Sequence, residues 1–308
     1  MTQTSISARA WVLMGILAFL WGGSFLSNRI ALEEVGVFTT VAARVAGAAT
    51  LMWLWVLMRG IPVPRSLRFV GICALLGALN NAVPFTLIVW GQQYVASGLA
   101  GILNAVTAIF GVVVAALVFA DEKLTPRKGI GVALGFAGVT VTIGVSNLTQ
   151  LNLTSLGQIA ILGSSLFYAI SAAIARVALR GVSPQVATAG MLTGATIFMV
   201  PMALSTEGLP TLDYSIQAWG ALIYLAALAS AVAYLLYYTV LDQAGAGNLL
   251  LVTLLVAPVA IVLGAIFYDE SLALRAYVGF ALLALGLLTI DGRLQKYLVK
   301  SQHPKEIS

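Results

Sequence analysis

Two adjacent asparagines interrupt an apolar run in the first third of the chain. The run reads A-L-N-N-A-V-P-F and holds Asn80, Asn81 and Pro84 close together. Proline lacks an N–H and displaces the carbonyl four residues earlier, here that of Asn80. A freed carbonyl and two side-chain amides could hydrogen-bond a polar solute, or they could hydrogen-bond a neighbouring helix. The sequence leaves both interpretations open.

Aromatic side chains recur at a spacing that places them on one helix face. In A-S-A-V-A-Y-L-L-Y-Y, Tyr234 and Tyr237 lie three residues apart, and residues three or four apart are neighbours on a helix surface. Together with Trp21, Phe85 and Tyr168 they could form an aromatic wall. Such stripes are also typical of plain helix packing. The hydroxyl groups favour a cavity, because a buried tyrosine needs a hydrogen-bond partner.

Further polar groups occur in other apolar runs. Ser24 follows Trp21 by about one helical turn, and Asn104 could line a cavity or bond another helix. The candidate substrate-binding residues are Trp21, Ser24, Asn80, Asn81, Phe85, Asn104, Ser164, Tyr168, Tyr234 and Tyr237. Pro84 and Pro258 are candidate kink or gating residues, because proline bends a helix.

Arg44 is the one basic residue that lies well inside an apolar run. A charge at the centre of a membrane helix costs about 2.5 to 3.5 kcal/mol on insertion scales, so it needs an acceptor. The acceptor could be helix-end carbonyls or the nearby Glu33 and Glu34. Alternatively, Arg44 could be the counter-charge for a substrate carboxylate.

Several kinds of site are not supported by the sequence. The chain has one cysteine, Cys73, and one histidine, His303, so we expect no metal site, no disulfide and no cofactor. It lacks the G-x-x-x-x-G-K-[ST] loop that binds phosphates, which argues against an ATP-driven pump. No acid and base pair is visible inside an apolar run, so we expect no enzyme. No carboxylate lies inside an apolar run either. Proton and sodium coupling usually use such a carboxylate, so its absence favours facilitated transport, or coupling by another mechanism that the sequence does not reveal.

The composition is that of an integral membrane protein. Hydrophobic residues make up 60% of the 308 positions and charged residues 9%, and the mean hydropathy is +1.00. This is too little polar surface to coat a soluble globule. The net charge of +5 does not indicate a nucleic-acid partner, since the basic residues lie in short loops and the tail.

Ten apolar segments are long enough to cross a bilayer as helices, which satisfy their own backbone hydrogen bonds. The sequence therefore predicts an all-α polytopic membrane protein, with spans at residues 11–32, 36–58, 68–90, 98–118, 126–144, 156–178, 184–204, 216–240, 246–267 and 273–291. Short cytoplasmic loops hold an excess of Lys and Arg. On this rule both termini are expected in the cytoplasm, where they join Arg59, Arg65, Arg68, Lys123, Arg127, Lys128, Arg176 and Arg180.

The chain contains one unit twice. F-A-D-E-K-L-T-P-R starts at Phe119 and F-Y-D-E-S-L-A-L-R starts at Phe267, at an offset of 148 residues. The first repeat is expected at 11–144, the second at 156–291, and a cytoplasmic tail at 292–308. Because each unit holds five helices, the second enters the membrane upside down, and such inverted repeats are typical of secondary transporters. The acidic pairs near Asp121 and Asp269 are expected to fix the loops before the last helix of each repeat.

The duplicated unit, W-G-G-S-F at Trp21, Arg44 in the second helix and the twin D-E-x-L endings resemble the drug/metabolite transporter superfamily. The chain resembles two EamA domains over nearly its whole length, and within the superfamily it is similar to bacterial aromatic amino acid exporters of the YddG type. The resemblance implies a central cavity between the halves and export by alternating access. Pro258 matches the proline that is usual in this family. Its counterpart in the first repeat, Phe110, departs from the family pattern because it is not a proline.

We therefore expect a secondary transporter that exports small metabolites, aromatic amino acids above all, across the bacterial inner membrane. The expected partners are a small-molecule substrate and membrane lipid, with a monomer as a plausible state. An exporter of cationic compounds remains an alternative, because aromatic cages also bind cations. A channel is less favoured, since no ring of carbonyls or charges suggests a selectivity filter.

Overall fold

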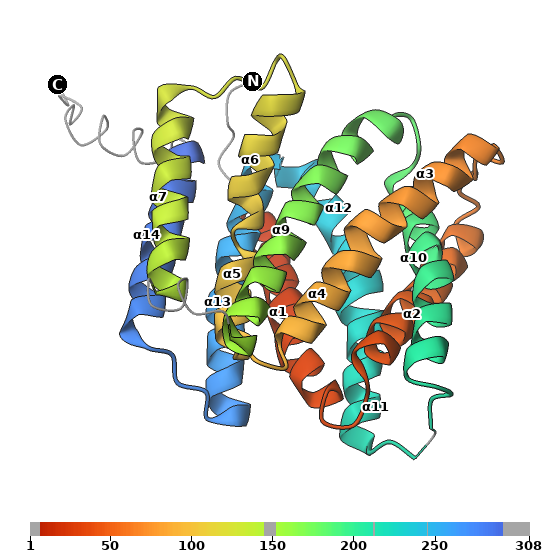
Figure 1. Cartoon of the computed structure of the whole chain (residues 1–308). Helices are drawn as coiled ribbons and strands as arrows, with labels where there is room; N and C mark the ends of the chain where they lie inside the picture. The colour runs from red at the N-terminus through yellow and green to blue at the C-terminus, as the bar shows by residue number, and fades with distance from the viewer. Residues whose placement is uncertain (1–6, 145–151, 212, 245, 292–308) are drawn as a thin grey trace.

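The computed structural model describes residues 7–144, 152–211, 213–244 and 246–291, and these residues form helices and loops without a β-strand. Figure 1 shows the helices packed into one bundle. We call the end that holds the C-terminus of α6 (Thr107–Val118) the upper end. The opposite end, where α11 (Ile216–Ile223) begins, is the lower end.

The expected apolar ranges all fall on helices. The other elements are α1 (Ala8–Ala31), α2 (Val37–Met58), α3 (Leu67–Gly77), the π-helical turn η1 (Ala78–Ala82), α4 (Val83–Gly91), α5 (Ser97–Asn104), α7 (Pro126–Ile143), α9 (Leu153–Ala178), α10 (Pro184–Thr206), the π-helical turn η2 (Tyr224–Val232), α12 (Ala233–Ala244), α13 (Ala246–Tyr268) and α14 (Leu274–Asp291). The expected tail at 292–308 lies outside the described residues.

Side-chain caps account for the helix starts that differ most from the prediction. The first helix begins at Ala8 because the Ser7 hydroxyl accepts a hydrogen bond from the Ala10 N–H at 3.2 Å. The helix predicted from residue 156 begins at Leu153, because the Asn152 side chain accepts a hydrogen bond from the N–H of Ser155 at 2.9 Å. Such caps satisfy N–H groups that a helix leaves unpaired.

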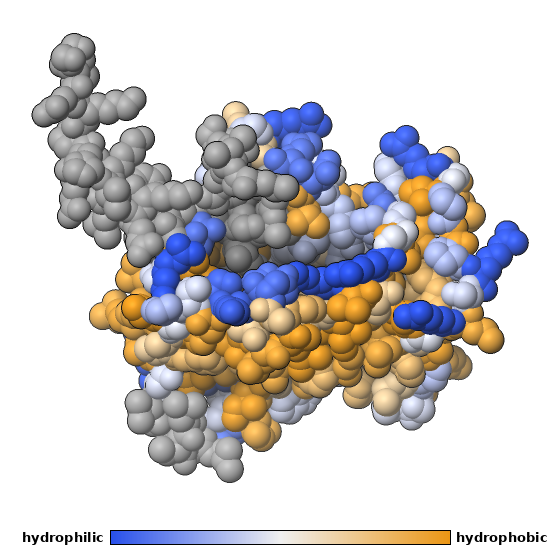
Figure 2. Space-filling model, turned by 90° about the horizontal axis from the view of Figure 1, so that it is seen from above, coloured by the Kyte–Doolittle hydropathy of each residue, from blue (hydrophilic) through white to orange (hydrophobic). Residues whose placement is uncertain are grey.

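Eight of the described helices are long and apolar enough to cross a membrane when continuous segments such as α3–η1–α4 are counted as one. Of α13, only Val252–Tyr268 enters this comparison, as a shorter apolar helix. The other predicted span outside the eight is α7, whose first turn carries Arg127 and Lys128. Figure 2, seen from the upper end, shows hydrophilic side chains in a band across this end and hydrophobic side chains beside it. The chain is an all-helical, multi-pass membrane protein.

Glycines let α7 and α14 run side by side in opposite directions. A Cβ placed on Gly131 would lie 2.6 Å from the Gly286 carbonyl oxygen, and one on Gly138 would lie 2.6 Å from that of Gly279. Residue numbers rise along one helix as they fall along the other, so the helices are antiparallel. Glycine at these positions therefore allows the two helices to pack closely.

Two carboxylates tie the lower end together. Glu270 accepts hydrogen bonds from the N–H groups of Ser97 (3.0 Å) and Gly98 (3.3 Å), at the start of α5. Glu207 likewise accepts bonds from two N–H groups at the start of α2, at 3.0 and 2.8 Å. A negative charge is stabilised at a helix N-terminus. Glu270 therefore joins its loop to α5, which the sequence does not predict.

Candidate functional site

A cavity of about 530 Å³ lies between the helices of the two repeats. Nine of the candidate residues line it, namely Trp21, Ser24, Arg44, Asn80, Phe85, Asn104, Tyr168, Tyr234 and Tyr237. They come from α1, α2, η1, α4, α5, α9 and α12, so the fold gathers residues up to 216 positions apart in the chain. Their contact with a substrate stays a prediction.

Four candidates do not line this cavity. Asn81 is fully buried behind it. Ser164 is also fully buried, and its hydroxyl donates to the Ile161 carbonyl at 2.6 Å. Pro84 directly follows η1 in the first turn of α4, and Pro258 lies inside α13. The structure thus places both prolines on helices around the cavity, outside its lining.

Arg44 has no carboxylate partner among the described residues. Its Nε donates to the Ser230 hydroxyl at 3.0 Å, and the guanidinium carbon lies 3.8 Å from the centre of the Phe85 ring. Glu33 instead accepts a hydrogen bond from Tyr268 at 2.6 Å, and Glu34 accepts one from the N–H of Ser215. The expectation that these glutamates satisfy Arg44 is therefore wrong. The cavity thus holds a cation, Arg44, whose charge no ion pair with a described residue balances.

Aromatic rings form much of the rest of the wall. Trp21 and Tyr237 have ring centres 5.9 Å apart, at an interplanar angle of 43°. Phe85 and Tyr168 meet edge to face, with centres 6.5 Å apart. Aromatic pairs prefer such tilted or edge-to-face arrangements. The open space next to these rings could hold a flat apolar group.

An amide and hydroxyl cluster lies beside the aromatic wall. Asn80 Nδ2 donates to the Asn81 side-chain oxygen at 2.9 Å and to the Tyr234 hydroxyl at 3.4 Å, and that hydroxyl donates to Asn81 at 3.3 Å. Asn81 therefore bonds a neighbouring helix, as one interpretation of the pair predicts, and Asn80 lines the cavity, where its contact with a solute stays a prediction.

The π-helical turns occupy corresponding helices of the two repeats. η1 contains Asn80, and η2 contains Ser230, which holds Arg44. A π-helical turn widens the helix locally and is frequent at functional sites. Pro84 is the sequence signal for η1, because proline has no N–H and its ring clashes with the carbonyl four residues earlier, so a regular α-helical turn cannot precede it. No comparable proline follows η2 in α12, and sequence reasoning missed this π-helical turn.

Sequence reasoning also missed a buried amide chain at the lower end. Gln92 is fully buried, and its Nε2 donates to the Phe25 carbonyl at 2.9 Å. Its Oε1 accepts a hydrogen bond from Asn28 Nδ2 at 2.8 Å, and Asn28 lines the cavity. The signal was a polar residue near the end of each of two apolar runs, a place where solvent exposure is the usual expectation.

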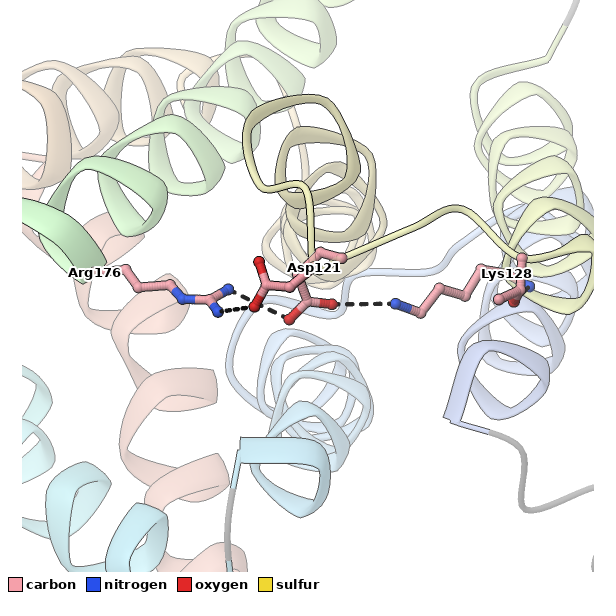
Figure 3. A network of polar contacts seen from close by, with 5 residues as sticks. Asp121, Lys128 and Arg176 are labelled. Carbon is pink, nitrogen blue, oxygen red and sulfur yellow. Dashed lines mark hydrogen bonds and ion pairs between the residues drawn. The ribbon is translucent and has the colours of Figure 1, made fainter.

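Ionic contacts mark the upper limit of the cavity lining, where Glu122 and Lys128 lie. Arg176 of α9 bonds Asp121 at 3.0 Å and Glu122 at 3.3 Å, and Lys128 of α7 bonds Glu122 at 3.2 Å (Figure 3). These side chains are partly exposed, so their pairing adds little stability. Charged side chains therefore lie at this end of the cavity. Among the described residues, no group of three or more His, Cys, Asp or Glu side chains could hold a metal ion.

Comparisons with known proteins identify the family. The model of the EamA-like transporter family matches residues 9–144 and again residues 155–290. An uncharacterized transporter of Archaeoglobus fulgidus is 26% identical over 242 residues, which cover 78% of this chain and 82% of the relative. A Streptantibioticus cattleyicolor protein named "Probable terminal-alkyne amino-acid exporter" is 26% identical over 292 residues, covering 94% and 95% of the two chains.

A solved crystal structure shares the fold, with a TM-score of 0.65 and 18% sequence identity, over 93% of this chain and 99% of the other. The family model covers most of the sequence in two copies. The chain therefore belongs to the EamA-like transporter family of the drug/metabolite transporter superfamily.

Proposed function

We propose that this protein is a secondary transporter that exports amino acids with aromatic side chains across the bacterial inner membrane. The observation that carries the proposal is the cavity, which combines an aromatic wall with a buried arginine that has no carboxylate partner among the described residues. The arginine attracts a carboxylate, and the rings of Trp21 and Tyr237 offer a surface for an apolar side chain. One of the relatives carries the name of an amino-acid exporter.

A cation is a poor fit to this cavity. Arg44 lies within it, and two positive charges in a medium of low dielectric repel each other strongly. Glu122, a carboxylate in the lining, already pairs with Lys128 and Arg176. The cavity charge thus favours the amino acid substrate over the alternative of a cationic compound.

We further propose that the chain crosses the membrane ten times as two inverted five-helix repeats. The glycine contacts support this arrangement, because the repeat offset of 148 relates Gly131 to Gly279 and Gly138 to Gly286. The half-turn that exchanges the repeats converts the Gly131–Gly286 contact into the Gly279–Gly138 contact. A two-fold axis in the membrane plane has this effect.

The upper end faces the cytoplasm in this proposal, because it carries Arg59, Lys128 and Arg176. Both chain termini then lie on the cytoplasmic side. The cavity lining reaches Glu122 at this end, whereas the amide chain of Gln92 and the Glu270 cap close the lower end. The structure then corresponds to the state that admits substrate from the cytoplasm, and alternating access would open the lower end in turn.

The topology is tested by placing single cysteines at two repeat-related loop positions. In a Cys73→Ala background, Lys123→Cys is expected to react with a membrane-impermeant maleimide only from the cytoplasmic side of membrane vesicles. Ser271→Cys is expected to react only from the other side, since the repeats are inverted. Reaction of both cysteines from the same side would refute the inversion.

The function is tested with purified protein in liposomes and radiolabelled phenylalanine. We expect saturable uptake that accelerates when unlabelled phenylalanine is loaded inside, because a carrier returns faster when it is occupied. Uptake that rises linearly with concentration and shows no such acceleration would indicate a channel. Uptake of a cationic dye without uptake of phenylalanine would indicate the alternative substrate class.

A further inference from the structure

We propose that Asn28 and Asn104 form a subsite that accepts hydrogen bonds from the ammonium group of the substrate, next to Arg44, which holds its carboxylate. This inference rests on the proposed function and names the part of the amino acid that each residue recognises. It predicts that the transporter selects zwitterions over acids that lack the amino group.

The hydrogen-bond chain at the lower end fixes the orientation of the Asn28 amide. The Phe25 carbonyl can only accept, so the Gln92 group facing it must be the NH₂ group. The Gln92 oxygen then faces Asn28 and must receive a hydrogen bond from the Asn28 NH₂ group. Asn28 Oδ1 is left as a buried acceptor with no partner among the described residues. The Asn28 amide cannot flip to give its oxygen a partner, because the flip would break its hydrogen bond to Gln92.

Asn104 supplies a second acceptor of the same kind. Its Oδ1 is buried and has no hydrogen-bond partner among the described residues. Its backbone carbonyl, in contrast, already accepts a hydrogen bond from Thr107 at 2.7 Å and one from Ser165 at 3.4 Å. A buried acceptor without a donor costs about 1 to 3 kcal/mol. Both asparagines line the cavity, where a bound substrate can supply the missing donors.

The two asparagines and Arg44 share the lower part of the cavity. Arg44 and Asn104 each follow the start of their helix by the same number of residues, and α2 and α5 both start at the lower end. At 1.5 Å per residue both lie about 10 Å from that end, and Asn28 lies about 5 Å from the end of α1. Trp21 is about 15 Å from the same end of α1. A substrate would therefore lie with its charged groups toward the lower end and its ring beside Trp21.

The charge of the lining explains why neutral acceptors are used. A carboxylate beside Arg44 would pair with it and compete with the substrate. Amide oxygens leave the arginine free and still accept from an ammonium group. A site with buried acceptors rejects an analogue that lacks the matching donor, because the acceptors then stay unpaired.

The test compares two labelled solutes in proteoliposomes: phenylalanine, and 3-phenylpropanoate, which keeps the ring and carboxylate but lacks the amino group. In the wild type we expect the KM for 3-phenylpropanoate to be about a hundredfold higher, because the buried acceptors of both Asn28 and Asn104 then lack a donor. Asn104→Leu is expected to raise the KM for phenylalanine about tenfold and to leave that for 3-phenylpropanoate unchanged. This unchanged value also shows that the variant is folded.

Gln158→Leu is the matched control. Gln158 is buried, and its side-chain oxygen, like that of Asn104, has no hydrogen-bond partner among the described residues. Unlike Asn104, Gln158 does not line the cavity. Its replacement should leave the ratio of the two KM values unchanged. Equal KM values in the wild type, or an equal change for both solutes in Asn104→Leu, would overturn the subsite alone. Absence of phenylalanine transport in the wild type would overturn the proposed function, and the subsite with it.

Discussion

Replacing Arg44 with methionine is expected to raise the KM for phenylalanine about 30-fold or more, the largest effect that we predict for a single cavity residue. Loss of one partner from a buried, hydrogen-bonded charge pair costs about 2 to 5 kcal/mol, and each 1.4 kcal/mol is a tenfold change. In the proposed function the partner is the substrate carboxylate, since Arg44 has no carboxylate partner in the described part of the chain. Initial uptake rates in proteoliposomes over a range of concentrations give the KM.

The folded state of this variant should be at least as stable as the wild type. Arg44 is only 6% exposed, and burial of a charge without an opposite charge is costly. Methionine removes that cost and fills similar space. The thermal midpoint of the purified protein is therefore expected to stay constant or rise while transport falls, which separates a binding role from a structural one.

Arg59→Met is the control on the same helix. Arg59 also lies over an aromatic ring, that of Trp55 at 4.7 Å, but it is exposed and outside the cavity. Its loss should leave the KM unchanged. If Arg44→Met transports phenylalanine with the wild-type KM, Arg44 is not the counter-charge.

Replacing Gly77 with alanine is expected to give the largest loss of stability. A Cβ at this position would lie 2.5 Å from the backbone nitrogen of Ala195 and still closer to the carbonyl oxygen of Met191, both on α10. Backbone atoms cannot rotate away, so α3 and α10 must separate. Overpacking of this kind costs about 1 to 3 kcal/mol, which corresponds to a thermal midpoint lower by about 2 to 12 °C.

Gly71→Ala is the matched control, because Gly71 lies on the same helix and a Cβ there meets no atom within 4 Å. Alanine favours the helix over glycine by about 0.5 to 1 kcal/mol, so this variant should be equal to the wild type or slightly more stable. Equal melting temperatures for Gly77→Ala and Gly71→Ala would show that α10 can move to accept the methyl group.

The helices could be predicted because membrane spans depend on local composition. Runs such as residues 36–58 need only be long and apolar, and α2 (Val37–Met58) matches this run closely. Capping residues mark where helices start, as at Thr125, whose hydroxyl accepts a hydrogen bond from the Lys128 N–H at 3.3 Å. The starts of α1 and α9 were misplaced because the serine and asparagine caps lie outside the apolar runs.

Contacts between distant residues could not be predicted from one sequence. Arg44 bonds Ser230, which is 186 positions away, and nothing near either residue indicates the other. The partners of Glu270 are 172 and 173 positions away. The position of Arg44 inside an apolar run indicates that it needs a hydrogen-bond acceptor. Which acceptor lies within reach depends on how the helices pack.

Most of the candidate residues line the cavity, because polar and aromatic side chains stand out in apolar runs. The same signal failed for Ser164, since a serine can satisfy its own hydroxyl on the preceding turn, as its bond to Ile161 shows. It also failed for Asn28 and Gln92, which lie near helix ends where polar residues need no special explanation. Polarity marks a candidate, and packing decides which surface it faces.

The crosswise glycine contacts of α7 and α14 have a consequence for how the halves associate. Gly131 contacts Gly286, and Gly138 contacts Gly279. Each half therefore contributes the same repeat-related surface to the contact, as each subunit does in a two-fold symmetric homodimer. None of these contacts depends on the peptide link that joins the first half to the second. Two separately synthesised fragments divided between residues 144 and 152 would thus retain the complete interface for reassembly.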